Sequence, residues 1–241
     1  MKLLLSCILA VSSYLCFAQK DASYWFDLGD VAAEKKEYKD AAKYFTKGLK
    51  LNNTDTDAYY NRGLARVELK NLDDAIADFT KVIELNPIDA DAYCERGSAK
   101  NDLGKYEDAV TDLDKAIELN PKKARYFNIR GNAKYDLGKY EEAFVDLTKA
   151  VDLNPNSAFI YYTRANAKYD LGKYQEALED YDKAIGISPK NTYAYYGRGL
   201  AKYNLGDYKE SVDDFNKAIE LNPHDADFKE SLKRAKEKLS K

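Results

Sequence analysis

The chain has 241 residues, with 38 lysines and arginines against 41 aspartates and glutamates, and a formal net charge of −3 at pH 7. This near-balance argues against nucleic-acid binding, which needs a basic surface, and 45% hydrophobic residues are enough to form a packed core. A single histidine leaves little room for His-based catalysis or a multi-His metal site. Composition therefore favours a protein that is not an enzyme and holds no cofactor or metal.

Residues 1–18 have the layout of a secretory signal peptide. One lysine precedes an apolar run from Leu3 to Leu15, and Cys16 and Ala18 are small residues three and one before a cut after Ala18. The run is shorter than the roughly 20 residues of a membrane helix, so no transmembrane span is expected. The sequence predicts export to the periplasm or outside the cell, with a membrane or lipid anchor as the less favoured alternative.

Cleavage after Ala18 would leave Cys94 as the one cysteine of the mature chain. A chain with one cysteine closes no internal disulfide, so its stability must come from packing. We expect a half-buried, unpaired thiol at Cys94, with intermolecular pairing as the alternative.

The remainder of the chain is a repeat with a period of 34 residues. Five prolines mark the period: Pro87, Pro121, Pro155, Pro189 and Pro223. Counting back from each proline gives five repeats, preceded by a weaker one: 22–55, 56–89, 90–123, 124–157, 158–191 and 192–225. Residues 226–241 follow the last repeat.

Each repeat carries two helical patterns separated by a turn. In 124–157 the first helix is predicted over 126–135 and ends near Gly138, which can take the left-handed conformation of a helix end. The second is predicted over 141–153 and ends at Asn154 and Pro155. Small residues such as Gly131 let the helices approach closely. Because one helix pair cannot bury its apolar faces alone, the repeats are expected to stack as an all-α solenoid.

This pattern resembles the tetratricopeptide repeat (TPR) family over residues 22–225. The resemblance rests on Trp25, Leu28, Gly29, Ala41 and Phe45 in the first repeat and on Tyr59, Gly63, Ala75, Phe79 and Pro87 in the second. It implies a right-handed superhelix of antiparallel helix pairs, an alpha-solenoid whose first helices line a concave groove for a partner segment.

Residues 226–241 are expected to form a C-terminal capping helix. Apolar residues form one stripe, and lysines surround it: Phe228, Leu232, Ala235 and Leu239, with Lys229, Lys233, Lys236 and Lys238. The last repeat of a solenoid needs a helix that covers its apolar face and presents a polar face to solvent. A basic helix for a membrane surface or a partner is the alternative.

Three charged positions depart from the family pattern. Positions 7 and 11 of the repeat are usually apolar, but five repeats carry basic residues there and an aspartate at position 23. These are Arg62, Arg66 and Asp78; Arg96, Lys100 and Asp112; Arg130, Lys134 and Asp146; Arg164, Lys168 and Asp180; Arg198, Lys202 and Asp214. The first repeat has Leu28, Ala32 and Tyr44 instead. An unpaired half-buried charge is costly, so we infer an ion pair between the two helices of each repeat.

The resemblance places positions 2, 5, 6, 9, 12 and 13 of each first helix on the groove. Ten of these residues are acidic and one, Arg125, is basic; the acids are Asp27, Asp30, Glu34, Asp57, Glu68, Asp91, Glu95, Asp102, Asp136 and Asp170. Tyrosines recur there with the period of the repeat, beside asparagines. The predicted partner-binding residues are Tyr60, Asn128, Asn132, Tyr135, Asp136, Tyr162, Asn166, Tyr169, Asp170, Tyr196 and Tyr203.

These residues favour an exported, non-catalytic protein–protein interaction scaffold. An extended, neutral or basic protein or peptide segment would lie in the acidic, Tyr-rich groove, where Tyr faces and carboxylates meet its cations. A glycan-binding module and a self-assembling structural envelope protein are alternatives, and the tyrosines and acids could also simply fill a solvated helix face. Position 6 holds no arginine and position 5 no lysine, so the carboxylate clamp of some family members is not expected.

Overall fold

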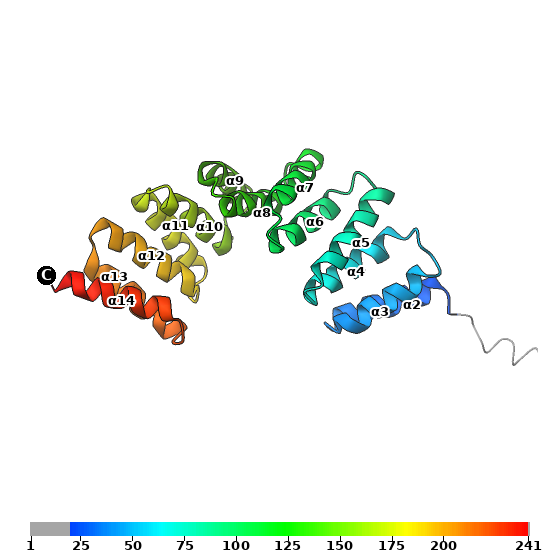
Figure 1. Ribbon diagram of the computed structural model, residues 1–241, viewed down its shortest axis with the longest axis horizontal. Coiled ribbons are helices and arrows are strands. Elements are labelled where there is room, and N and C mark those ends of the chain that lie inside the picture. The colour runs from blue at the N-terminus through cyan, green and yellow to red at the C-terminus, as the bar shows by residue number, and fades with distance from the viewer. Residues whose placement is uncertain (1–19, 241) are drawn as a thin grey trace, which may run out of the picture. The chain divides into compact units, whose positions relative to one another are not determined.

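The computed structural model describes residues 20–240, and these residues form thirteen helices and no strand (Figure 1). The predicted signal peptide, residues 1–18, lies outside the described residues. The chain divides into two compact units, with the boundary between Ala92 and Tyr93 inside one helix. Each unit is described by itself below.

The N-terminal unit holds α2 (Ala22–Glu34), α3 (Tyr38–Leu49), α4 (Thr56–Glu68), α5 (Leu72–Leu85) and the start of α6 (Ala90–Asp102). The C-terminal unit holds the rest of α6, α7 (Tyr106–Leu119), α8 (Ala124–Asp136), α9 (Tyr140–Leu153), α10 (Ala158–Asp170), α11 (Tyr174–Ile187), α12 (Thr192–Leu205), α13 (Tyr208–Leu221) and α14 (Ala226–Leu239). Even-numbered helices up to α12 are the first helices of the repeats, and odd-numbered ones are the second helices.

Within each unit the helices pack as consecutive pairs. In the N-terminal unit α2 packs on α3 and α4 on α5; in the C-terminal unit α8 packs on α9, α10 on α11 and α12 on α13. Neighbouring first helices also contact one another, as α8 does with α10 and α10 with α12. Among the described helices no such contact joins α9 to α11 or α11 to α13. The first helices therefore line the tighter, inner side of each unit, which we call the first-helix face.

The turn between the two helices requires a left-handed residue at one fixed position. Gly104, Gly138 and Gly172 have φ of 73° to 74° there, and Gly206 has 90°. Glycine adopts this conformation without steric cost. In the first two repeats Lys36 and Lys70 take it instead, each with φ of 61°.

Small residues bring the two helices of a repeat together, as expected. A Cβ on Gly131 of α8 would lie 2.8 Å from Cγ of Leu147 on α9. Leu147 and its neighbours Ala143 and Ala150 are fully buried. No side chain larger than hydrogen fits between the two helices at this point, so the glycine sets how closely they pack.

The predicted ion pair between helices is confirmed. Arg130 binds Asp146 through two parallel hydrogen bonds, Nε to Oδ2 at 2.8 Å and Nη2 to Oδ1 at 2.5 Å. Lys134 adds a third contact, with its Nζ 2.8 Å from Oδ2. Asp146 is only 3% exposed. The same arrangement recurs at Asp78, Asp112, Asp180 and Asp214. We call each set the buried ion triad of its repeat.

Candidate functional site

Three tyrosines recur on consecutive first helices of the C-terminal unit, at the positions predicted for a ladder. Tyr135, Tyr169 and Tyr203 lie on α8, α10 and α12, all half-buried. Each ring packs on the tyrosine of its own interhelical turn, with ring centroids 5.2 to 5.3 Å apart. The three tyrosines are thus held in place by Tyr140, Tyr174 and Tyr208, and each remains partly exposed.

The hydroxyl groups of the ladder connect one repeat to the next. Tyr135 donates its O–H to the carboxylate of Asp170. Asn204 donates from Nδ2 to the hydroxyl oxygen of Tyr169, at 2.7 Å. Burial and then the hydrogen bond to Asp170 raise the pKa of Tyr135, so this hydroxyl remains a donor at neutral pH. Position 12 of one repeat is therefore bonded to position 13 of the next.

A second row of predicted residues lies on α10 and α12. Tyr162 packs near Tyr181, with ring centroids 6.3 Å apart, and Asn166 accepts a hydrogen bond of 2.8 Å from the Tyr181 hydroxyl. The hydroxyl of Tyr196 lies 3.2 Å from Oγ of Ser231 on α14. These contacts orient the two tyrosines and Asn166 on the first-helix face.

Tyr181 was not predicted as part of the site, because it belongs to a second helix. It stands where other repeats have Phe45, Phe79 or Leu147, and its hydroxyl reaches Asn166 across the repeat. Gly197 leaves space for it, since a Cβ there would lie 2.6 Å from the Tyr181 hydroxyl oxygen. The signal in the sequence is that Tyr181, which is larger than the residues at this position in those repeats, is accompanied by Gly197 in the following repeat.

The remaining predicted residues of the C-terminal unit lie on α8. Asn128 is buried, and its Oδ1 accepts a long hydrogen bond of 3.5 Å from the hydroxyl of Thr163. Asn132 is half-buried, and Asp136 is an exposed carboxylate whose pKa is raised by partial burial. Asn128 and Asn166 both use their carbonyl oxygens as acceptors within the protein.

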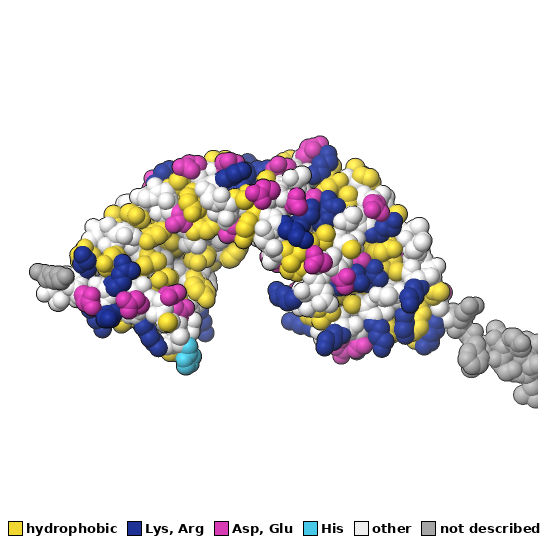
Figure 2. Space-filling model, in the orientation of Figure 1, with side chains coloured by type: hydrophobic (Ala, Val, Ile, Leu, Met, Phe, Trp, Pro, Cys, Tyr) yellow, Lys and Arg dark blue, Asp and Glu magenta, His cyan; other side chains and the backbone are white. Residues whose placement is uncertain are grey.

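Two aromatic side chains on the same face are largely exposed. Phe159 on α10 and Tyr193 on α12 occupy the same position of consecutive repeats, and each is 55% exposed. In Figure 2 hydrophobic side chains gather over α10 and α12. Large exposed rings on one side of a fold are typical of an interaction surface.

The acidic excess of the predicted groove is partly neutralised in the C-terminal unit. Arg125 forms a bidentate ion pair with Glu95, with Nη2 2.8 Å from Oε2. The one basic residue predicted for the groove is therefore bound to one of its acids. Asp170 is likewise engaged, as the acceptor for Tyr135.

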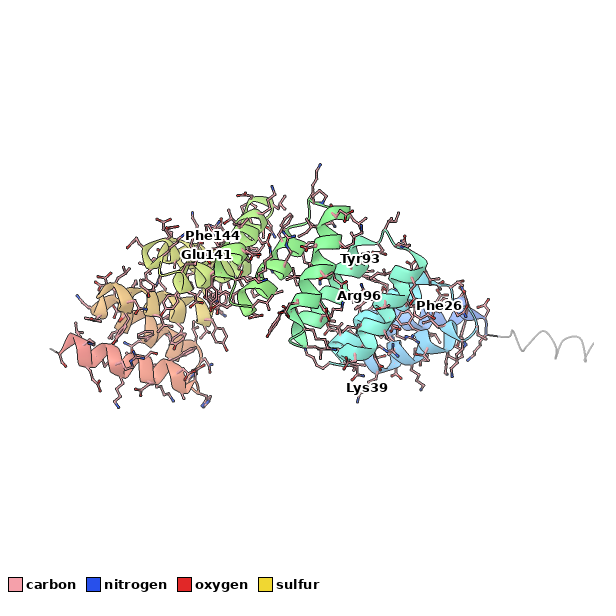
Figure 3. All side chains as sticks on the ribbon, turned by 45° about the horizontal axis from the view of Figure 1, so that its top comes forward. Phe26, Lys39, Tyr93, Arg96, Glu141 and Phe144 are labelled. Carbon is pink, nitrogen blue, oxygen red and sulfur yellow. The ribbon has the colours of Figure 1, made fainter. Side chains whose placement is uncertain are left out.

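The acids of the N-terminal unit gather around a cavity of about 320 Å³ between α2 and α4. Its lining includes Asp27, Asp30, Asp55 and Asp57 beside Phe26, which Figure 3 labels. Burial raises the pKa of Asp30, although the hydrogen bond from Asn61 lowers it; the neighbouring carboxylates raise it further.

Tyr60, predicted as part of the same groove, lies on α4 in the N-terminal unit. Its ring meets Phe79 edge-on, with centroids 5.7 Å apart. The structure thus places it in a different unit from the other ten predicted residues, which all lie on α8, α10 and α12.

At the C-terminal end, a smaller cavity of about 100 Å³ lies between α10, α12 and α14. It is lined by Tyr169, Leu200, Tyr203, Asn204, Phe215, Ser231 and Arg234. The guanidinium of Arg234 lies 5.5 Å from the centre of the Tyr203 ring. Arg234 was absent from the predicted site, because residues 226–241 were interpreted as a capping helix, or alternatively as a basic helix for a membrane surface or a partner, and Arg234 itself was given no role. If the 34-residue count is continued past residue 225, Arg234 takes position 9, the position of Asn132 and Asn166 in their repeats. This equivalence is the sequence signal that could have found it.

Cys94 lies on α6 and is fully buried, where the sequence predicted a half-buried thiol. Among residues 20–240 no group of three or more His, Cys, Asp or Glu side chains is placed to hold a metal ion. No helix in this range is both long and apolar enough to cross a membrane.

The consecutive helix pairs of the two units define a helical-repeat protein. Family comparison agrees: the description "Tetratricopeptide repeat" matches residues 22–55, 56–89, 90–123 and 192–225, and "TPR repeat" matches 131–172 and 165–206. The chain belongs to the tetratricopeptide repeat family, whose members are typically non-catalytic scaffolds for protein or peptide partners. No curated protein matches the chain.

Solved structures with the same fold include MamA, which is 29% identical; the match covers 70% of this chain and 92% of MamA, with a TM-score of 0.62. YrrB, described as a TPR protein with an unusual peptide-binding site, is 24% identical over 81% of this chain and 100% of its own, with a TM-score of 0.66. A tetratricopeptide repeat protein from Parabacteroides merdae is 23% identical over 90% of this chain and 85% of its own, with a TM-score of 0.68. The last two show the fold alone.

Proposed function

We propose that this protein is an exported, non-catalytic scaffold that binds an extended segment of a partner protein along the first-helix face. The observation that carries the proposal is the pair of exposed rings, Phe159 and Tyr193, beside the ordered tyrosines of α10 and α12. Aromatic side chains held rigid by their neighbours supply contact area at a low cost in entropy.

The chemistry of the face favours a segment with exposed peptide groups. The amide N–H groups of Asn132 and Asn166, which are both half-buried, can donate to backbone carbonyls of an extended chain. YrrB, with the same fold, is described as having a peptide-binding site. Export is proposed from residues 1–18, and it places the partner in the periplasm or outside the cell.

The acids of the N-terminal unit, taken by itself, favour a basic or neutral segment. Asp27, Asp30 and Asp57 line one cavity with Phe26, and a lysine or arginine side chain carries both the charge and the apolar stem that such a lining suits.

The test is a paired capture of partners from an extract of the source organism. The variant replaces Phe159 and Tyr193 by serine. Both side chains are largely exposed, so the fold should persist. A partner retained by the unchanged protein and lost by the variant supports the proposal.

The matched control is Val145→Ser, which removes an exposed apolar side chain, 65% exposed, from the second helix α9. Equal loss in the control and the double variant would show general stickiness and contradict the proposal. A retained partner that is a glycan, insensitive to salt, would replace it with the glycan-binding alternative. Concentration-dependent size without any captured partner would favour self-assembly.

A further inference from the structure

Arg234 is exceptional among the arginines of this protein. Every other arginine in residues 20–240 is paired with a carboxylate, including Arg125, whose side chain is 49% exposed. Arg234 has no carboxylate partner in the described part of the chain. Glu230 and Glu237 lie one turn away on α14, and neither forms an ion pair with it. Arg234 is an exposed residue of α14, and its guanidinium contacts an aromatic ring instead of a carboxylate.

That ring is Tyr203. The guanidinium lies over this ring, 5.5 Å from its centre, and a planar guanidinium on an aromatic face keeps its N–H groups free for in-plane hydrogen bonds. Tyr203 is in turn fixed by Tyr208, at 5.3 Å between centroids. The charged group is thus oriented before any ligand arrives.

Other hydrogen-bond donors converge on the same cavity. The hydroxyl oxygen of Tyr169 accepts from Asn204, which leaves the Tyr169 hydrogen to donate. Ser231 lines the cavity from α14, and Leu200 and Phe215 provide apolar walls. A cavity of about 100 Å³ has room for a carboxylate with one or two methylene groups, since a water molecule occupies about 30 Å³ of liquid.

We infer that this cavity binds an aspartate or glutamate side chain of the partner segment. The guanidinium would receive the carboxylate in a bidentate pair, Tyr169 would donate to it, and Leu200 would contact its methylene groups. This inference rests on the proposed function and refines it: the bound segment carries an acidic residue at the position that reaches α14. A chain-terminal carboxylate would have to bring a whole backbone end into a cavity of this size, so we assign the side chain.

The test is selection of random dodecapeptides displayed without a free C-terminus on the immobilised whole chain. The unchanged protein should enrich Asp or Glu at one fixed position of the selected peptides. Arg234→Gln should abolish that enrichment, and Arg234→Glu should replace it with Lys or Arg. Lys233→Gln is the matched control, since it removes the same charge from the neighbouring exposed residue of α14 and should change nothing.

A selected peptide then provides the quantitative measurement. Changing its acidic residue to the amide should weaken binding to the unchanged protein about tenfold, and should have little effect on the Arg234→Gln variant. All variants should first show the helicity and melting temperature of the unchanged protein.

The outcomes separate this inference from the proposed function. Peptides selected without an acidic preference would overturn the inference and leave the scaffold function standing. Acid-dependent binding only with a library that has free C-termini would overturn the side-chain assignment. Failure to select any peptide would count against both.

Discussion

The first repeat and the five that follow build the same helix pair with different interiors. Repeats two to six join their helices through a buried ion triad, as at Arg130, Lys134 and Asp146. The first repeat has no acid or base at these positions. There Trp25 stacks on Tyr44, with centroids 5.9 Å apart, and Lys47 lies 3.9 Å from the centre of the Trp25 ring.

The difference shows that the triad is not required for a helix pair to form. Its members are mutually dependent, because each buried charge is tolerated only in the presence of the others. An aromatic stack with one cation over it occupies the same region in the first repeat. The comparison therefore predicts a large loss of stability when one member of a triad is removed. It predicts a small loss when all three members are replaced by the residues of the first repeat.

The largest effect is expected from Asp146→Ala. It leaves Arg130 and Lys134 without the buried carboxylate that they share, and breaking such a pair costs about 3–5 kcal/mol. Urea denaturation followed by circular dichroism measures the loss. Glu141→Ala, at an exposed position of the same helix, is the control, and a loss no larger than in that control would refute the role of the triad.

A smaller effect is expected from Trp25→Ala in the first repeat. The change removes the stack on Tyr44 and the contact with Lys47, together worth about 2 kcal/mol. Hydrogen exchange should report faster opening of α2 while α12 keeps its protection. Trp25→Phe should restore about half of the loss. Uniform loosening of all helices would contradict a local role.

Exchanging the whole triad should cost less than breaking it. The triple variant R130L/K134A/D146Y gives the fourth repeat the three residues of the first repeat. Its free energy of unfolding should fall by about 1 kcal/mol, because no unpaired buried charge remains. The three single variants provide the control. If the triple variant loses as much as the sum of the singles, the charges act independently and the comparison fails.

The smallest effect concerns the acidic cavity of the N-terminal unit. The pKa of Asp30 is raised by burial and by the neighbouring acids, so the folded state binds this proton more readily than the unfolded state. The contribution of Asp30 to stability therefore falls as pH rises through the interval between its unfolded and its raised folded pKa. Asp30→Asn removes this dependence and keeps an acceptor for Asn61.

We expect the free energy of unfolding of Asp30→Asn, measured by urea denaturation, to match that of the unchanged protein at pH 3 and to exceed it slightly at pH 7. The difference should be about 0.5 kcal/mol or less, because the carboxyl is largely in contact with solvent. Glu37→Gln, at an exposed site, should show no such pH-dependent difference. A variant less stable than the unchanged protein at pH 7 would show that the Asp30 charge is favourable.

Features that follow from the repeat itself could be predicted from the sequence. The turn at Gly138, the close approach at Gly131 and the pairing of Arg130 with Asp146 all join residues of one repeat, at separations that at least four of the six repeats share. A buried charge that recurs beside an opposite charge must be paired, so period and composition sufficed.

Features of the site that depend on neighbouring repeats could not be predicted in the same way. Tyr135 and Asp170 are 35 residues apart, and so are Tyr169 and Asn204. Arg125 was predicted as the one basic residue of the groove, but in the structure its charge is neutralised by Glu95, 30 residues away. Which hydroxyl meets which amide depends on side-chain geometry between stacked helices, and a difference of one residue in position changes the partner.

The sequence by itself determined the number of repeats, their helix pairs and the ion triads, because these arise from spacing within 34 residues and from the cost of unpaired buried charge. Only the tertiary structure decided which tyrosines are exposed, which acids are already bound, and that Arg234 lies on the Tyr203 ring without a carboxylate. Those properties depend on which side chains adjacent helices bring into contact, since a side chain can bind a partner only with the groups that its own neighbours leave unsatisfied.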